Sequence, residues 1–377
     1  MDSKKRDGTD INLNNTQAKK YSNTKLIIGI TEAVLSFVLL LLFIILNFSL
    51  QLEIYIRNFI SSDYLTLLIF VLALSFISLI LFAPFNFYTG YYLEHKYNLS
   101  NQTFWKWIIE GLKGSLVGAV IGIPLLFLFY FILKNFGINW WLPFGALMFI
   151  VSVLLAQIVP IIILPIFYKI TPIENESLKE RIVNLSKNAG LNVQNVYKFN
   201  MSKNTKKANA AFTGLGKTKR ILLGDTLLDN YSEDEIETVI AHELGHYKRK
   251  HIIKNIFIGT VFSFLTFFLI AQLHRLSLNW FGFSEITQIA SLPLLFLWGA
   301  IIGLVQTPIS NYISRRFEYE ADNYAVISTN KKAEFIQTLE KLTDQNLGDR
   351  EPHPFVEWFF YSHPSIKNRT NNLSTLN

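Results

Sequence analysis

Two histidines four residues apart, with a glutamate directly after the first, form the clearest chemical pattern in the chain: His242-Glu243-Leu244-Gly245-His246. On a helix, residues spaced i and i+4 lie on one face about one turn apart, so both imidazoles can reach a single metal ion. Glu243 points to a neighbouring face, where its carboxylate can accept a proton from water. This H-E-x-x-H pattern is typical of zinc-dependent peptide hydrolysis. We predict that His242 and His246 bind Zn²⁺ and that Glu243 is the general base.

A third ligand must come from elsewhere, because a protease zinc site takes three protein ligands and keeps the fourth position for water. His251 is one candidate. Its spacing from His246 is one residue too short for the pattern H-E-x-x-H-x-x-G-x-x-H, in which Arg249 would also have to be glycine. On a continuous helix His251 would point away from His246, so we expect it to be a polar residue at the membrane interface.

Glu318 is the better candidate for the third ligand. It lies in the charged stretch at residues 315–322, with the sequence RRFEYEAD. Glu318 and Asp322 are spaced i, i+4 and share a helical face, whereas Glu320 faces elsewhere. We predict that Glu318 completes the metal site and that Asp322 accepts the spare N–H of a ligating histidine. Without the histidine motif, the same stretch would indicate only a solvated charged helix.

Composition predicts a polytopic membrane protein. Hydrophobic residues make up 50% of the 377 residues and charged residues only 17%, against about 25% charged residues in a typical soluble domain. The net charge of +7 could suggest nucleic acid, but no nucleic-acid motif accompanies it. Basic loops of a membrane protein explain it better. The absence of cysteine excludes disulfides, thiolate metal sites and cysteine nucleophiles.

About six segments are apolar and long enough to cross a bilayer, which needs about 20 residues. Residues 1–24 are polar and aperiodic, and we predict a disordered tail. The first apolar run could be a signal peptide, but it is long and lacks a cleavage site, which favours a retained anchor. The predicted spans are Leu26 to Leu50, Tyr64 to Phe85, Leu112 to Leu133, Trp141 to Tyr168, Ile252 to Leu273 and Ile286 to Pro308.

The distribution of lysine and arginine orients these spans. Basic residues concentrate in the tail, in the loop after the second span and in the polar segments 169–251 and 309–377, while the alternate loops are nearly uncharged. We therefore expect both polar segments to face the cytoplasm. The membrane region would then comprise four spans at 25–168 and a two-span hairpin at 252–308. The predicted fold class is mainly α, a membrane helical bundle with a cytoplasmic α/β metalloprotease domain.

Residues 169–251 read as a compact α/β unit. An amphipathic helix is predicted at 178–190, and short strands at 193–199, 208–212 and 220–223. Ser232 and Glu235 have the capping-box spacing that begins the helix carrying both motif histidines.

The chain resembles the CAAX prenyl protease type 1 family. Members of this family are integral-membrane zinc endopeptidases of the gluzincin type. The resemblance covers residues 80 to 370. The matching motifs, in order, are Thr171-Pro172, Asn209-Ala210-Ala211-Phe212, Arg220-Ile221-Leu222-Leu223, Gly224-Asp225-Thr226-Leu227-Leu228, His242 to His246 with His251, Arg316 to Asp322, and Ser362-His363-Pro364 with Arg369.

The resemblance implies roles for residues that spacing alone does not assign. His363 would help to stabilise the oxyanion, and Arg369 would lie near the substrate backbone. Asn209, with Ala210 and Ala211, would pair with an extended peptide by edge addition. The substrate would be a peptide or protein, and proteins with a prenylated C-terminal CAAX sequence are the candidates that the resemblance implies. Members of the family enclose a chamber with seven spans, of which only six are predicted here.

Two other functions fit part of the pattern. Bacterial heat-shock membrane proteases share the zinc motifs and clear misfolded membrane proteins, but they are shorter, and the His363-Pro364 motif favours the prenyl-protease type. A transporter with an accidental H-E-x-x-H would carry ionisable groups or broken helices at midplane. The predicted spans offer only Gln157, Gln306 and a few prolines.

Overall fold

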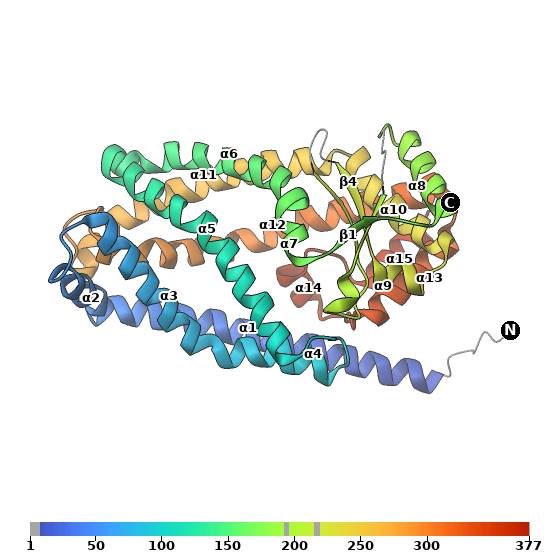
Figure 1. Ribbon diagram of the computed structural model, residues 1–377, viewed down its shortest axis with the longest axis horizontal. Coiled ribbons are helices and arrows are strands. Elements are labelled where there is room, and N and C mark those ends of the chain that lie inside the picture. Colours follow the sequence, from blue (N-terminus) through green and yellow to red (C-terminus); the bar gives the residue numbers. More distant parts are fainter. Residues whose placement is uncertain (1–7, 192–195, 215–218, 377) are drawn as a thin grey trace.

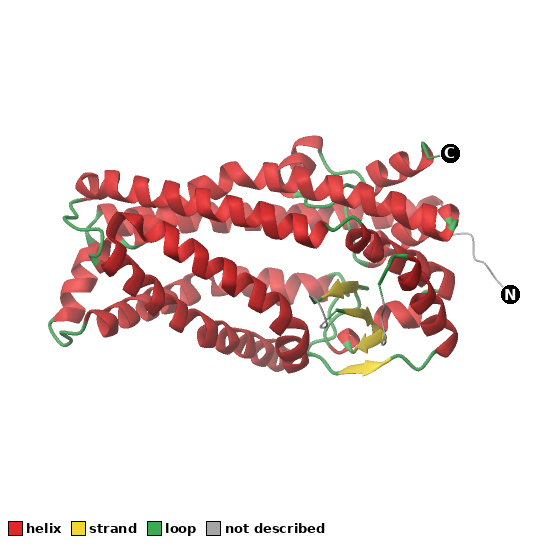
Figure 2. Cartoon of the chain, turned by 90° about the horizontal axis from the view of Figure 1, so that it is seen from above, coloured by secondary structure: helices red, strands yellow, loops and turns green. Residues whose placement is uncertain are grey.

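The structure is a computed structural model that describes residues 8–191, 196–214 and 219–376. Long helices run along most of the molecule, and the strands and most of the short helices gather at one end (Figure 1, Figure 2). The fold is therefore mainly helical with one small α/β region, as the sequence predicts.

Five stretches of the described chain are long and apolar enough to cross a membrane. The third, Phe104–Phe167, contains 64 residues. As one straight helix it would be about 96 Å long, about three times the hydrocarbon core of a bilayer. The chain instead turns back at Gly137, whose φ of +54° suits glycine, and forms a hairpin (Figure 1). Counting both arms gives six long apolar helices among the described residues, close to the predicted number of about six.

The six crossing helices are α1 (Gly8–Ile45), α3 (Asp63–Phe87), α5 (Phe104–Phe136), α6 (Trp141–Ile158), α11 (His251–Ser277) and α12 (Pro293–Thr329). Shorter helices connect or extend them, namely α2 (Phe48–Arg57), α4 (Leu93–Lys96) and α7 (Leu164–Phe167).

The sheet of the α/β region has four strands in the order β1-β2-β4-β3. Their bounds are β1 (Ile170–Pro172), β2 (Val196–Phe199), β3 (Ala210–Thr213) and β4 (Arg220–Gly224). The β2–β4 pair is parallel and the other two pairs are antiparallel. The predicted strands at 208–212 and 220–223 correspond to β3 and β4, and the first residues of the predicted strand 193–199 lie outside the described chain. Because β3 is an outer strand, one of its edges is free of sheet pairing.

Six helices complete this region: α8 (Glu176–Asn188), α9 (Asp225–Asn230), α10 (Glu233–Lys248), α13 (Lys332–Gln345), α14 (Pro354–Phe360) and α15 (Ile366–Ser374). Helix α10 begins with the predicted capping box, in which the side chains of Ser232 and Glu235 accept each other's backbone N–H groups. Its buried residues Ile236, Ile240 and Leu244 pack into one core with apolar side chains of α8, β4, α12 and α13. This core fixes the helix that carries the motif histidines.

Helix α12 runs without interruption from the membrane into the α/β region. It has 37 residues, which corresponds to about 55 Å, and a bilayer core takes only about 30 Å. The predicted boundary between residues 308 and 309 therefore falls inside a helix. As a result, the stretch that carries Glu318 is a rigid extension of a membrane span.

The prediction of a disordered tail over residues 1–24 is wrong for the part that the structure describes. Residues 8–24 belong to α1, and residues 1–7 lie outside the described chain. Ala18 and Tyr21, three residues apart on α1, are each 5% exposed and pack against leucines beside α4 and α13. The low apolar content of this segment suggested disorder. Ala18 and Tyr21 are nevertheless buried, because residues distant in the sequence pack against them.

Candidate active site

Helix α10 presents His242 and His246 on one face. Their Nε2 atoms lie 3.2 Å apart, and their side chains are 11% and 23% exposed. The i, i+4 spacing thus brings the two ring nitrogens to one point in a partly buried site.

Gly245 allows α12 to approach this face. A Cβ at residue 245 would lie 2.9 Å from the Cα atom and 3.0 Å from the carbonyl oxygen of Ala321, so a side chain would push the helices apart. The close crossing brings Glu318 to both imidazoles. Nε2 of His242 lies 3.4 Å from Oε2 of Glu318, and Nε2 of His246 lies 3.3 Å from Oε1.

The donor atoms of His242, His246 and Glu318 fit a tetrahedral metal ion. One ligand atom from each residue lies within 4.8 Å of the others. Ligands at zinc distances of about 2.0–2.1 Å are about 3.3 Å apart in a tetrahedron. The two Nε2 atoms are 3.2 Å apart, and each lies 3.3 to 3.4 Å from one of the two oxygens of the Glu318 carboxylate. Oε2 of Glu318 is buried without a hydrogen-bond partner among the described residues, as expected of an atom that binds a cation.

Asp322 and Arg369 lie behind His242. Nδ1 of His242 lies 2.8 Å from Oδ1 of Asp322, whose side chain is 0% exposed. Arg369 donates to both oxygens of Asp322, at 2.8 and 2.5 Å. Burial opposes the charged form of His242, but the nearby carboxylates of Asp322 and Glu318 outweigh it and raise the pKa of the imidazole to about 10. A cation that binds this imidazole therefore displaces a proton.

His251 lies behind His246, which sequence analysis did not foresee. Its Nδ1 atom is 2.9 Å from Nδ1 of His246, and its Nε2 atom is 3.0 Å from Oε2 of Glu320. The expectation that His251 points away from His246 is wrong, and its side chain is buried at 1% exposure. The chain is not one continuous helix here. It breaks at Lys250, whose φ is +58°, and this break turns His251 back toward His246.

Glu243 faces the free edge of β3. Oε2 of Glu243 accepts a hydrogen bond of 3.3 Å from the backbone N–H of Phe212. The carbonyl of Asn209 is used within the sheet, because it accepts from the N–H of Gly224. Since backbone groups alternate in direction along a strand, Ala210 and Phe212 present theirs to the cleft and Ala211 pairs with β4. Phe212 is a residue that sequence reasoning missed, although strand alternation could have indicated it.

A cleft of about 760 Å³ opens over the metal ligands. The predicted residues Asn209, Ala210, His363 and Arg369 all line it. The side chain of His363 is 66% exposed, and its Nε2 atom lies 3.5 Å from Oε1 of Glu318. The structure thus brings an exposed histidine, an extended strand and the three candidate ligands to one cavity.

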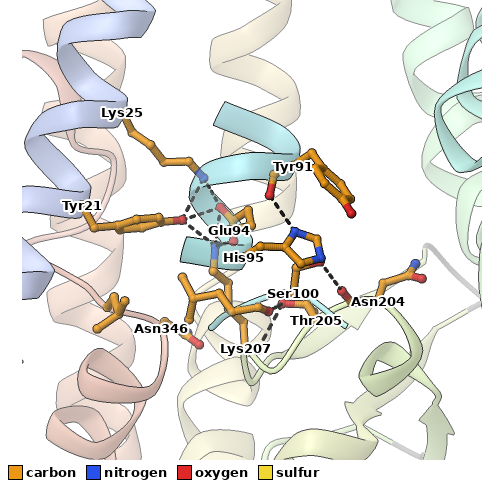
Figure 3. A network of polar contacts seen from close by, with 12 residues as sticks. Tyr21, Lys25, Tyr91, Glu94, His95, Ser100, Asn204, Thr205, Lys207 and Asn346 are labelled. Atoms are coloured by element: carbon orange, nitrogen blue, oxygen red, sulfur yellow. Dashed lines mark hydrogen bonds and ion pairs between the residues drawn. The ribbon is translucent and has the colours of Figure 1, made fainter. Parts of the chain in front are cut away.

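A polar network anchors the segment that leads into β3 (Figure 3). The carboxylate of Glu94, at the end of the second span, accepts hydrogen bonds of 2.5 Å from the side chains of Tyr21 and Lys25 of α1. It also forms an ion pair of 3.0 Å with Lys207. Asn346, at the end of α13, accepts a hydrogen bond from the N–H of Ala208 and donates one to its carbonyl. Membrane helices and the end of α13 therefore both hold the start of the cleft strand in place.

Comparisons with known proteins agree with this geometry. Residues 172–377 match peptidase family M48, and residues 13–169 match the CAAX prenyl protease N-terminal family, described as five membrane helices. CAAX prenyl protease 1 of Saccharomyces cerevisiae is 32% identical over 80% of this chain and 70% of its own length. The human CAAX prenyl protease 1 homolog is 30% identical over 82% of this chain and 74% of its own length.

A bacterial relative and a solved structure show the same likeness. The uncharacterized metalloprotease YhfN of Bacillus subtilis is 31% identical over 93% of this chain and 83% of its own length. The crystal structure of S. mikatae Ste24p has a TM-score of 0.86 and 29% identity, and the match covers 96% of this chain and 89% of that chain. The chain therefore belongs to peptidase family M48, as an integral-membrane metalloendopeptidase of the CAAX prenyl protease type.

Proposed function

We propose that this endopeptidase binds one Zn²⁺ through His242, His246 and Glu318 and hydrolyses an extended peptide held along β3. The observation that carries the proposal is the set of donor separations, 3.2 to 3.4 Å, beside a carboxylate that faces a free strand edge. Two imidazoles and one carboxylate are the ligand set of several zinc peptidases.

Peptide hydrolysis at this site would need a Lewis acid, a general base and an oxyanion donor. Bound zinc would supply a Lewis acid for the scissile carbonyl and lower the pKa of water toward about 7. Glu243 accepts the proton of the attacking water and then gives it to the leaving amine. His363 reaches into the cleft from an exposed position, where it can donate to the developing oxyanion.

The free edge of β3 would hold the substrate backbone. Ala210 and Phe212 offer their outward N–H and carbonyl groups to an added strand, and the side chain of Asn209 lines the cleft beside them. Substrate binding would replace the hydrogen bond from Phe212 to Glu243 and free this carboxylate for proton transfer. Arg369 is bonded to Asp322, so we assign it first to that carboxylate and only then to the substrate.

We infer that the catalytic region faces the cytoplasm and that the substrates include prenylated C-terminal CAAX peptides. The concentration of basic residues in the polar segments supports the orientation. The names of the yeast and human relatives support the substrate class. The heat-shock alternative is not favoured, because CAAX prenyl proteases match over most of the chain.

Cleavage of a fluorogenic peptide by the purified protein tests the proposal, with and without a chelator and with Glu243→Gln. We expect the chelator to abolish cleavage and zinc to restore it. Glu243→Gln should keep zinc and lose about 10²- to 10⁴-fold in kcat, since that is the usual contribution of a general base. Parental turnover by this variant would contradict the assignment. A farnesylated peptide compared with its unprenylated form tests the substrate class separately.

A further inference from the structure

His246 is held by a second histidine rather than by a carboxylate. We propose that His251 and Glu320 form a hydrogen-bonded relay that holds His246 in the one tautomer and orientation able to bind the metal ion through Nε2. Both are positioning residues. The inference rests on the proposed zinc site and adds to it two residues outside the ligand set.

Backbone conformation shows that this contact is built into the fold. Helix α10 ends at Lys248, and Lys250 adopts the left-handed region with φ of +58° and ψ of +33°. This region is unfavourable for a residue with a Cβ atom, so surrounding contacts must compensate for it. The turn sends α11 off in a new direction and returns its first residue, His251, to the ring of His246.

Packing fixes the ring of His251 as well as its position. Its imidazole stacks on the ring of Phe317, with centroids 4.2 Å apart and an angle of 9° between the planes. Phe317 precedes Glu318 on α12, so the residue that supports His251 is adjacent to the third metal ligand. A shift of α12 would disturb the ligand and the relay together.

The positions of the nitrogens dictate where the protons lie. His246 must keep Nε2 free for the metal ion, so in its neutral form the proton is on Nδ1. Nδ1 of His246 then donates across 2.9 Å to Nδ1 of His251. His251 must therefore carry its own proton on Nε2, which donates across 3.0 Å to Oε2 of Glu320. Only this arrangement satisfies all three groups when the metal is bound.

Glu320 ends the relay at the protein surface. Its side chain is 44% exposed and lies 3.6 Å from Nζ of Lys254. The sequence pattern placed Glu320 away from the metal site, and this remains true of its direct contacts. Its carboxylate acts on the site through the ring of His251.

Zinc affinity measured by chelator competition tests the relay without reference to turnover. Loss of such outer partners usually costs about 10- to 100-fold in metal affinity. We expect this loss for His251→Ala. His251→Asn should recover most of it, because its side-chain oxygen can accept from Nδ1 of His246. Glu320→Gln should weaken affinity less than His251→Ala. Lys187→Ala, at an exposed position of α8, is the surface control and should match the parent.

Two further readouts separate the outcomes. The absorption spectrum of the Co²⁺-substituted protein should change in His251→Ala and not in Lys187→Ala, since only the former alters a ligand's orientation. Size-exclusion profile and Tm in detergent identify variants that fail to fold, and the exposed Glu320→Gln keeps the test possible in that case. The relay is overturned if folded His251→Ala keeps the zinc affinity and the cobalt spectrum of the parent. If His251→Ala does not fold, the same result for Glu320→Gln overturns it. A parent that binds no zinc overturns the proposed zinc site and the relay together.

Discussion

The two histidines of α10 reach the same point but are held in different ways. His242 contacts a carboxylate directly, and Asp322 is fully buried and bonded in turn to Arg369. His246 contacts the imidazole of His251, and the carboxylate beyond it is 44% exposed. We call these the Asp322 side and the His251 side of the metal centre.

The difference follows from the free energy needed to bury a charged carboxylate compared with a neutral imidazole. An ionised carboxylate at 0% exposure needs a paired cation and several hydrogen bonds, because an isolated buried charge costs several kcal/mol. Arg369 from α15 supplies both. A neutral imidazole costs far less to bury, so the His251 side places its charge, Glu320, near solvent. The Asp322 side should therefore be the more sensitive to substitution.

Breaking the Asp322 side should give the largest effect. Asp322→Ala leaves Arg369 buried without its partner, and breaking a buried pair in this way costs about 3–5 kcal/mol. We expect the free energy of unfolding to fall by that amount and zinc affinity to fall more than in His251→Ala. Denaturant unfolding in detergent and chelator competition measure the two quantities. If Asp322→Ala proves no more damaging than His251→Ala, the comparison between the sides is wrong.

A change that acts on both sides should have an intermediate effect. Gly245→Ala places a Cβ against the backbone of Ala321, and overpacking of this kind costs about 1–3 kcal/mol. Because α10 would move away from α12, Glu318 would be drawn from both histidines, and zinc affinity should fall at least tenfold.

Gly259→Ala is the matched control for this prediction. Gly259 lies in α11, and an added Cβ there meets no atom within 4 Å. Alanine also has the higher helix propensity, so this variant should keep parental zinc affinity and Tm. Equal behaviour of the two glycine variants would show that the close crossing at Gly245 is unimportant.

The smallest effect is expected for a substitution of Asp234, at the start of α10, because its side chain is exposed and contacts neither the Asp322 side nor the His251 side directly. Asp234 accepts hydrogen bonds from Lys331 and Arg181, and these hold the pKa of its carboxyl below the ordinary 3.8. A lowered folded-state pKa contributes stability that is present above the unfolded value and is lost as pH falls through the folded value.

Asp234→Asn should therefore lower stability at pH 7 by less than about 1 kcal/mol, because the pair is exposed. The difference from the parent should shrink below pH 3.8, as both proteins then lack the charge. Tm measured against pH checks this, together with unchanged zinc affinity at pH 7. A deficit that persists undiminished at low pH would point to packing rather than charge.

The residues at helical spacing were the predictable part of this site. His242 and His246, and likewise Glu318 and Asp322, share faces because their spacing is i, i+4, and the structure places all of them together. Helix periodicity is local, so a sequence displays it directly. The apolar spans and the capping box at Ser232 could be predicted for the same reason, because each depends on residues close together in the sequence.

The parts that escaped prediction depend on single backbone angles or on distant contacts. No glycine or asparagine marks the turn at Lys250, so no local signal indicates that His251 returns to His246. The order of residues 8–24 depends on partners far along the chain, such as Glu94. Arg369 and Asp322 meet across a separation of 47 residues, which no local pattern reveals.

Zinc content per chain, measured by elemental analysis after purification, tests the central claim most directly, because everything else depends on three residues holding one ion. The parent should contain one zinc, and His242→Ala and Glu318→Ala should contain essentially none while Lys187→Ala matches the parent. A parent without zinc, or parental zinc content in Glu318→Ala, would contradict the account.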